Sequence, residues 1–116
     1  MLHLFIMRHA ESDFKNYDGD DFNRDISNNG SLETENILNY LEKKKINFDK
    51  IHYSPSLRTK KTYDIIKKKN KFSEIFGEAD VTLYETDYKK IFYKLTKLKY
   101  YKNLLLITHE PQICSL

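Results

Sequence analysis

The sequence has 116 residues, of which 40% are hydrophobic and 32% charged, and its formal net charge is +3. This length fits one domain with a modest core, so residues 1–116 are expected to form a single domain. No run approaches the roughly 18 apolar residues that a membrane helix needs, so no membrane partner is expected. The single cysteine, Cys114, excludes an internal disulfide and favours a reducing, cytoplasmic setting.

Basic side chains are spread along the chain rather than gathered in one segment. The sharpest basic run covers residues 67–71. It indicates a solvated helix end, because neither an aromatic platform nor a helix-turn-helix turn accompanies it. We therefore expect no nucleic-acid partner, and we expect a monomer.

Apolar runs alternate with segments of helical periodicity. Strands are predicted over residues 2–7, 50–53, 79–84 and 103–108, and helices are predicted to begin near residues 27, 54 and 88. This alternation is typical of an α/β fold, a three-layer sandwich in which helices cover both faces of a mostly parallel sheet. The Leu-rich run 103–108 is expected to be a central strand.

Capping residues predict where the helices begin, and the spacing of apolar residues predicts which side chains face the sheet. Ser27 is expected to cap the first helix and Ser54 the second, with Pro55 at its first position. The side chains expected to face the sheet are Ile37, Leu38 and Leu41 in the first helix, Leu57, Ile65 and Ile66 in the second, and Tyr88, Ile91, Phe92, Leu95 and Leu98 in the third. Glu110 and Pro111 mark a further helix start close to the end of the sequence, so we expect a C-terminally truncated domain.

Arginine is rare in a chain that uses lysine for most of its positive charge. Its three arginines are Arg8, Arg24 and Arg58, against seventeen lysines. A planar guanidinium fork is suited to bidentate pairing with phosphate or carboxylate. These three positions are therefore candidates for binding an anion, with Arg24 the weakest because it lies in a loop.

Three polar residues come directly after predicted strands. His9, Ser54 and His109 follow the first, second and fourth strands, and Arg58 lies one turn into the second helix. Ligands of open α/β sheets bind outside the carboxyl ends of the strands, so these loops are expected to converge on one pocket. Taken singly, each histidine is also compatible with a polar strand end, and Arg58 with a surface position.

The acidic cluster of one loop and the two remaining histidines are not expected to take part in the site. Asp18, Asp20 and Asp21 form an acidic cluster without the spacing of a calcium loop, so a solvated loop and no metal site are expected. His3 and His52 lie within predicted strands and are expected to be structural.

Four short motifs, in order along the chain, resemble those of the histidine phosphatase superfamily. They are residues 5–11 (Phe-Ile-Met-Arg-His-Ala-Glu), 24–30, 53–62 and 105–111. In the first, Ala10 stands where the family commonly has glycine, and in the second, Asp25 replaces the usual proline. The short, single-domain phosphohistidine phosphatases of the SixA type look most similar.

This resemblance implies the phosphoglycerate mutase-like fold and a set of site residues. It implies His9 as the nucleophile that becomes phosphohistidine. Arg8, Arg58 and His109 would line the phosphate pocket, with Ser12 and Arg24 as further substrate contacts. Larger family members carry an acidic general acid after the third strand, and Glu85 is the candidate for it here.

The chemistry of these residues agrees with phosphoryl transfer. A neutral imidazole is the nucleophile, and neighbouring arginines keep it neutral by disfavouring a second positive charge. Side-chain cations stabilise the transferred group, so no cofactor and no metal are expected. We expect a phosphatase acting on a phosphorylated protein histidine. The alternatives are a hydrolase of small phosphate monoesters, which would need Glu85, and a catalytically weak phosphate-binding module.

Overall fold

The computed structural model describes residues 3–15, 18–84, 88–97 and 101–109. Its four strands are β1 (His3–Arg8), β2 (Lys50–Tyr53), β3 (Phe76–Ala79) and β4 (Asn103–Thr108). They form one sheet in the order β1-β4-β2-β3, and every pairing within it is parallel. The Leu-rich strand β4 lies inside the sheet, as the sequence predicts.

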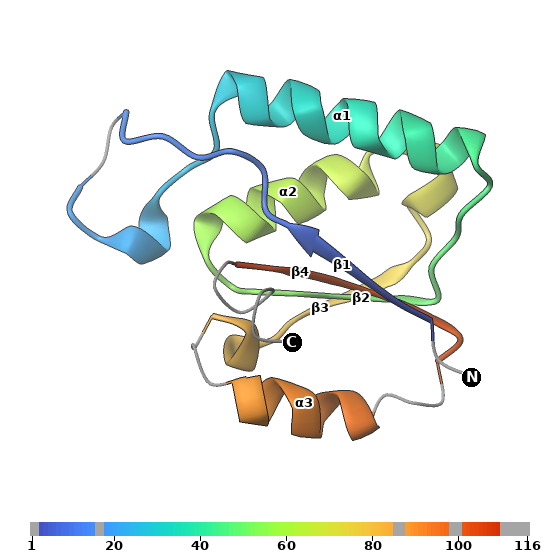
Figure 1. The fold of residues 1–116 in the computed structure, drawn as a ribbon. Coiled ribbons are helices and arrows are strands. Elements are labelled where there is room, and N and C mark those ends of the chain that lie inside the picture. Colours follow the sequence, from blue (N-terminus) through green and yellow to red (C-terminus); the bar gives the residue numbers. More distant parts are fainter. Residues whose placement is uncertain (1–2, 16–17, 85–87, 98–100, 110–116) are drawn as a thin grey trace.

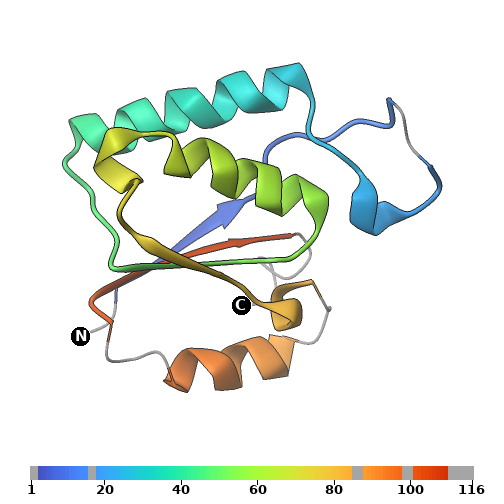
Figure 2. The same cartoon turned by 180° about the vertical axis from the view of Figure 1, so that it is seen from behind.

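Helices cover both faces of this sheet. The helices α1 (Asn28–Lys43) and α2 (Leu57–Lys67) lie on one face, and α3 (Tyr88–Lys97) lies on the other (Figures 1 and 2). Short 3-10 turns follow the loop after β1, helix α2 and strand β3, namely η1 (Asp21–Asn23), η2 (Asn70–Phe72) and η3 (Val81–Leu83). The predicted three-layer α/β sandwich is confirmed. No helix in the described ranges has the length and apolar character needed to cross a membrane.

Strand β4 supplies side chains to both layers of the core. Leu105 and Ile107 pack with Leu38 and Ile66 from α1 and α2. Leu104 and Leu106 point the other way, toward the cluster that includes Ile91 of α3 and Leu83. A strand buried on both faces has to be apolar at successive positions, which explains the unbroken apolar run at 104–107.

The third strand was predicted too late in the sequence. It covers Phe76–Ala79, not residues 79–84, and Val81–Leu83 forms η3 instead. The Asp80 carboxylate accepts hydrogen bonds from the backbone N–H and the hydroxyl of Thr82, at 3.1 and 2.7 Å. This local pairing turns the chain where apolar content alone favoured a strand.

The second helix also begins later than predicted. Ser56, not Ser54, holds the N-cap position, and its side chain makes no capping hydrogen bond. The buried residues of α2 are Arg58, Thr59, Thr62 and Ile66, so most of its inward face is polar.

Several side chains expected to face the sheet do not. Leu57 and Ile65 are half-buried, whereas Ile37 is 46% exposed and Phe92 is 64% exposed. Ser27 caps α1 as predicted, accepting a hydrogen bond from the backbone N–H of Gly30 at 3.0 Å.

Candidate active site

The polar residues singled out in the sequence meet at the carboxyl ends of the parallel strands. Arg8 pairs in register with Thr108, and Tyr53 with Ile107, so β1, β2 and β4 end at the same level. His9, Ser54 and His109 are the residues that follow these three strand ends, and all three are buried. The predicted convergence of three loops is therefore present.

His9 is held by its own backbone and by that of its neighbour. Its backbone N–H donates to the carbonyl of Thr108 at 3.1 Å, and its ring Nδ1 lies 2.7 Å from the carbonyl oxygen of Ala10. A carbonyl can only accept, so Nδ1 carries the proton and Nε2 keeps its lone pair. Burial, with help from the Arg58, Arg8 and Arg24 charges, lowers the His9 pKa to about 4. His9 is thus a neutral ring with a free nitrogen at neutral pH.

Helix α2 fixes the loop that carries His9. The backbone N–H of Ala10 donates to the Thr62 hydroxyl at 2.8 Å, and that hydroxyl donates to the carbonyl of Arg58 at 2.8 Å. Thr62 is fully buried. The helix that contributes Arg58 therefore also sets the position of His9.

Helix α1 fixes the same loop from the other side. The backbone N–H of Ser27 donates to the carbonyl of Glu11 at 2.7 Å, and the Ser27 hydroxyl donates to the Glu11 carboxylate at 2.9 Å. A Cβ added at Gly30 would lie 2.7 Å from the backbone nitrogen of Glu11. Glycine is needed at this position because the helix backbone touches the loop directly.

His109 is oriented by a serine from the neighbouring strand end. Its ring Nε2 lies 2.8 Å from the Ser54 hydroxyl oxygen, which also accepts from the backbone N–H of Ser56 at 3.4 Å. We assign the Ser54 hydroxyl as the donor to Nε2, because no other acceptor for it lies among the described residues, and this assignment places the His109 proton on Nδ1. Burial, followed by the Arg58 charge, lowers the His109 pKa to about 3. The rings of His9 and His109 lie with their centroids 5.2 Å apart.

Two arginines complete the cluster. The Arg58 side chain is buried, and its Nη1 and Nη2 donate to the backbone carbonyl and the carboxylate of Asp21, at 2.7 and 3.0 Å. Arg24 lies with its guanidinium 4.9 Å from the centroid of the Phe14 ring. The charges of both arginines act on His9 and His109.

Three N–H groups of this cluster are buried without an acceptor. Arg24 Nε, Arg58 Nε and His109 Nδ1 have no hydrogen-bond partner among the described residues. A buried donor left unpaired costs about 1–3 kcal/mol, so folded proteins rarely gather such groups without a purpose. Together with the positive charge of the arginines, they form a site suited to an oxyanion.

The remaining predicted site residues are less closely associated. The Arg8 side chain is exposed and, within the described residues, makes no hydrogen bond or ion pair; its charge still lowers the His9 pKa. Ser12 is half-buried and pairs through its backbone with Ile26. The candidate acid Glu85 lies outside the described residues, as does Asp87, the other acidic residue near the predicted end of the third strand.

The acidic loop is exposed, as predicted, and Asp21, whose side chain is 52% exposed, also has an ion-pair partner. Asp18 and Asp20 are exposed and accept hydrogen bonds from the loop backbone, but Asp21 binds Arg58. In the described part of the chain, no group of three or more histidine, cysteine, aspartate or glutamate side chains is placed to hold a metal ion. Of the other two histidines, His3 is exposed and His52 is buried in β2, 3.4 Å from the Asp80 carboxylate.

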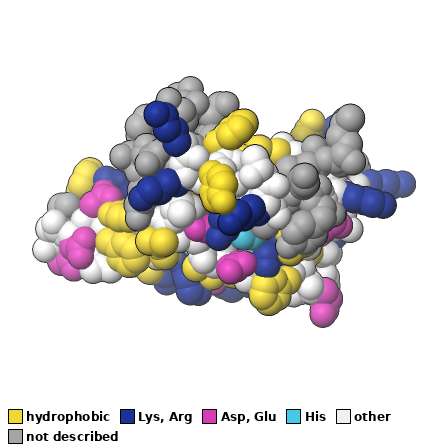
Figure 3. Space-filling view, turned by 90° about the horizontal axis from the view of Figure 1, so that it is seen from below, with side chains coloured by type: hydrophobic (Ala, Val, Ile, Leu, Met, Phe, Trp, Pro, Cys, Tyr) yellow, Lys and Arg dark blue, Asp and Glu magenta, His cyan; other side chains and the backbone are white. Residues whose placement is uncertain are grey.

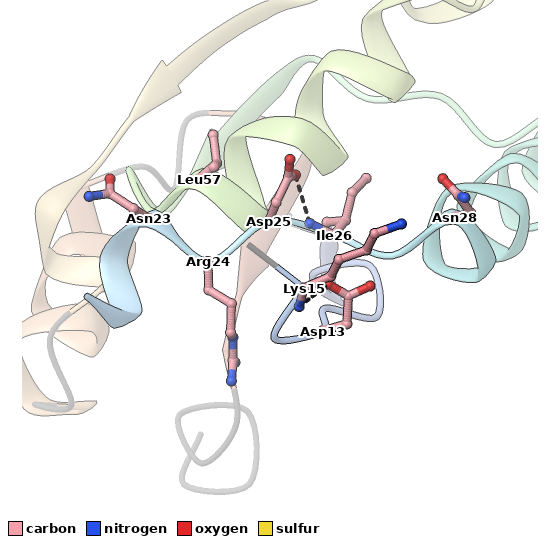
Figure 4. A pocket seen from close by; sticks show the side chains of 8 residues that line it. All are labelled: Asp13, Lys15, Asn23, Arg24, Asp25, Ile26, Asn28 and Leu57. Atoms are coloured by element: carbon pink, nitrogen blue, oxygen red, sulfur yellow. Dashed lines mark hydrogen bonds between the residues drawn. The ribbon is translucent and has the colours of Figure 1, made fainter. Parts of the chain in front are cut away.

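Two cavities border the cluster. One, of about 340 Å³, lies in the loop beside Arg24 and is lined also by Lys15 and Asn23 (Figure 4). Arg24 and Asp25 point to opposite sides there, and the Asp25 carboxylate accepts from the N–H of Ile26 at 2.7 Å. The acid that replaces the usual proline therefore does not neutralise Arg24.

The second cavity is a groove of about 730 Å³ along the edge strand β1. It begins at Arg8 and His9 and continues between β1 and α1, where Leu4 and Ile37 line it.

The space-filling view of the face that carries α3 shows basic side chains mixed with acidic and hydrophobic ones (Figure 3).

Several contributors to the site were missed from the sequence. Thr62 lies within the motif at residues 53–62, so its place in that motif could have marked it as a site residue. Ser54 was predicted to lie at this pocket, but as a helix cap and not as the partner of His109. Asp21 lies three residues before Arg24, but spacing alone does not reveal that it binds Arg58. Tyr84 follows η3, and its ring packs edge-on against His109 with centroids 5.7 Å apart.

The sequence model of the histidine phosphatase superfamily (branch 1) matches residues 4–98. The chain belongs to this superfamily. The matched range contains His9, Arg24 and Arg58, and the structure adds His109, which directly follows β4. No curated protein matches the sequence significantly.

Solved structures of phosphatases and of a mutase share the fold. A SixA protein from Agrobacterium tumefaciens, provisionally assigned as a phosphohistidine phosphatase, is 19% identical, with a TM-score of 0.86 over 97% of this chain and 71% of that one. A protein histidine phosphatase SixA in complex with tungstate is 25% identical, with a TM-score of 0.83 over 95% and 70%. A phosphoglycerate mutase from Bacillus anthracis is 14% identical, with a TM-score of 0.77 over 97% and 76%. The phosphoglycerate mutase-like fold is thereby confirmed.

Proposed function

We propose that the chain is a phosphohistidine phosphatase that works through a covalent intermediate on His9. The observation that carries the proposal is the set of three buried, unpaired N–H groups beside a neutral histidine with a free Nε2. The donors suit the equatorial oxygens of a transferred phosphoryl group, and the ring nitrogen suits in-line attack on phosphorus.

The reaction has two steps that balance without a cofactor. In the first, Nε2 of His9 attacks phosphorus, the bond from phosphorus to the substrate nitrogen breaks, and the leaving imidazole takes a proton from solvent. In the second, water attacks the phosphohistidine, releasing inorganic phosphate and restoring neutral His9. Arg58, Arg24 and His109 donate to the phosphoryl oxygens in both steps, and Arg8 contributes positive charge at the rim.

A phosphorylated protein histidine is favoured as the substrate for two reasons. An imidazole leaves readily once protonated near neutral pH, so no protein acid has to be placed for it. The similar SixA structures are named for activity on phosphohistidine, and tungstate, bound in one of them, is a tetrahedral oxyanion like phosphate. The single cysteine is compatible with a cytoplasmic setting, where such phosphoproteins would be met.

A hydrolase of small phosphate monoesters is the second candidate. The similarity to a phosphoglycerate mutase favours it, because that protein is named for a small phosphate ester. An alkoxide leaving group needs a proton from a positioned acid, and Glu85 is the candidate in the sequence.

The experiment compares cleavage of a phosphohistidine-bearing peptide with that of alkyl phosphates, for the wild type and for Glu85→Gln. Faster cleavage of the peptide, unaffected by Glu85→Gln, supports the proposed function. Faster cleavage of alkyl phosphates that Glu85→Gln removes supports the ester hydrolase. Phosphate binding without turnover of either substrate would indicate that the chain is a phosphate-binding module and not a phosphatase.

A further inference from the structure

The Arg58 side chain in the candidate site is already bound to another residue, Asp21. Its Nη1 donates to the backbone carbonyl of Asp21 at 2.7 Å, and its Nη2 donates to the carboxylate of the same residue at 3.0 Å. Asp21 thus grips the end of the guanidinium at two points. Residues 21 and 58 come from different elements, η1 and α2, so this contact also ties the loop after β1 to the second helix.

This grip leaves three of the five guanidinium N–H groups unbound by Asp21, one of them on Nε. A guanidinium has five N–H donors, and Asp21 takes one from each terminal nitrogen. The Nε of Arg58 is buried and has no partner among the described residues. A phosphoryl oxygen can therefore be bound by Nε while Asp21 continues to hold the terminal nitrogens.

Asp21 also connects Arg58 with the surroundings of His109. The Tyr84 hydroxyl donates to the Asp21 carboxylate at 3.3 Å, and the Tyr84 ring packs edge-on against His109. Phe22, which follows Asp21 in η1, packs edge-on against the same Tyr84 ring, with the ring centroids 5.1 Å apart. One carboxylate thereby links the two residues expected to bind the phosphoryl group.

We infer that Asp21 is a positioning residue, which holds the Arg58 fork so that Nε faces the transferred phosphoryl group. The inference rests on the proposed phosphatase function for the identity of the ligand. The alternative is that Asp21 is a competing anion, which a phosphate must displace from Arg58. The two roles predict opposite effects of removing the carboxylate.

The test is a set of Asp21 variants titrated with inorganic phosphate, with binding followed by NMR. Asp21→Ala removes both the charge and the side-chain acceptor, and we expect it to weaken phosphate binding about tenfold, or about 1.4 kcal/mol, because the guanidinium loses the hydrogen bond that holds it in place. Asp21→Asn keeps an acceptor oxygen of the same shape, and we expect binding within about threefold of the wild type. Asp18→Asn is the matched control, because it removes the same charge from an exposed residue of the same loop and keeps the acceptor for Asp20.

A double-mutant cycle shows whether Asp21 acts through Arg58. If it does, most of the effect of Asp21→Ala on phosphate binding disappears once Arg58 is replaced by alanine, and what remains acts through Arg24, whose Nη2 lies 3.9 Å from the Asp21 carboxylate. Equal or tighter binding by Asp21→Ala and Asp21→Asn would overturn the inference in favour of a competing anion. A loss that persists unchanged in the Arg58→Ala background would overturn it too, because Asp21 would then act by another route.

The same variants assayed for turnover separate this inference from the proposed function. If phosphate binding follows the expected cycle but no substrate is hydrolysed, Asp21 positions Arg58 in a binding module and the proposed activity fails. If the wild type hydrolyses phosphohistidine but Asp21→Ala retains full phosphate affinity and full kcat, the positioning role fails and the activity stands.

Discussion

Ser54 and His109 are 55 positions apart in the sequence, yet the Ser54 hydroxyl lies 2.8 Å from Nε2 of the His109 ring. The contact forms because β2 and β4 are neighbouring parallel strands that end at the same level. It fixes the orientation of the His109 ring, and with the Ser54 hydroxyl assigned as the donor the ring proton lies on Nδ1, where it can meet an oxyanion.

Replacing Ser54 by alanine should therefore impair His109 without unfolding the protein. We expect kcat/KM to fall about tenfold, consistent with the loss of one or two hydrogen bonds worth about 0.5–1.5 kcal/mol each. Nitrogen NMR of His109 should show a larger share of the Nε2–H tautomer. Ser73→Ala, which removes an exposed serine hydroxyl far along the chain, serves as the control. An unchanged tautomer and an unchanged rate would show that Ser54 does not orient the ring.

Arg58→Lys tests whether the fork matters beyond its charge. Lysine keeps a positive charge, but its three donors lie on one nitrogen, so it cannot hold Asp21 through two separate nitrogens while a third nitrogen faces phosphate. We expect a loss in kcat/KM on the order of 2–4 kcal/mol, as for removal of one donor that stabilises charge in the transition state. Lys60→Arg, two residues further along α2 at an exposed position, is the matched exchange and should leave the rate unchanged. Equal kinetics for Arg58→Lys and the wild type would mean that Arg58 acts only as a charge.

The lowered pKa values of His9 and His109 predict how stability depends on pH. Burial lowers these pKa values from 6.5 to about 4 and about 3, so below pH 6.5 the unfolded chain binds more protons than the folded one. Stability is therefore expected to fall as the pH drops from 6.5 toward 4. The midpoint of thermal unfolding of His9→Gln should fall less over this range than that of the wild type. Identical slopes would contradict the burial of a neutral His9, and His3→Gln, at an exposed strand position, is the control.

Hydrolysis by side-chain cations alone should not depend on a metal ion. We expect full activity after treatment with EDTA, because the arginines and His109 supply the donors for the phosphoryl group. The check is the rate before and after chelation and after addition of Mg²⁺ or Zn²⁺. Loss of activity that a metal restores would show that the transferred group needs more than these side chains.

The order of elements could be predicted because periodicity and strand length are local properties of the sequence. β2 and β4 match the predicted ranges, and β1 extends one residue beyond its predicted end. The third strand was misplaced because the Asp80 carboxylate turns the chain within an apolar run. The polar inward face of α2 could not be predicted from apolar spacing, because Thr62 and Arg58 are buried by contacts with other loops.

The site was predictable to the extent that strand ends determine it. His9, His109 and Arg58 meet as the sequence indicates, since parallel strands bring their carboxyl ends together. Asp21 and Tyr84 could not be assigned, because their roles depend on how the loop after β1 folds back onto α2 and onto the turn after β3. These contacts join elements that are far apart in the sequence, and no sequence pattern relates the two partners.

The central claim is that His9 accepts the phosphoryl group, and trapping the intermediate tests it most directly. The protein is mixed with a phosphohistidine-bearing peptide and quenched in alkali, and its own peptides are then analysed by mass spectrometry. The account predicts a phosphoryl group on His9 in the wild type, its absence in His9→Ala, and activity of that variant below about a tenth of the wild-type rate, a loss above about 1.4 kcal/mol. A phosphoryl group on His109 instead, or a higher rate in His9→Ala, would contradict it.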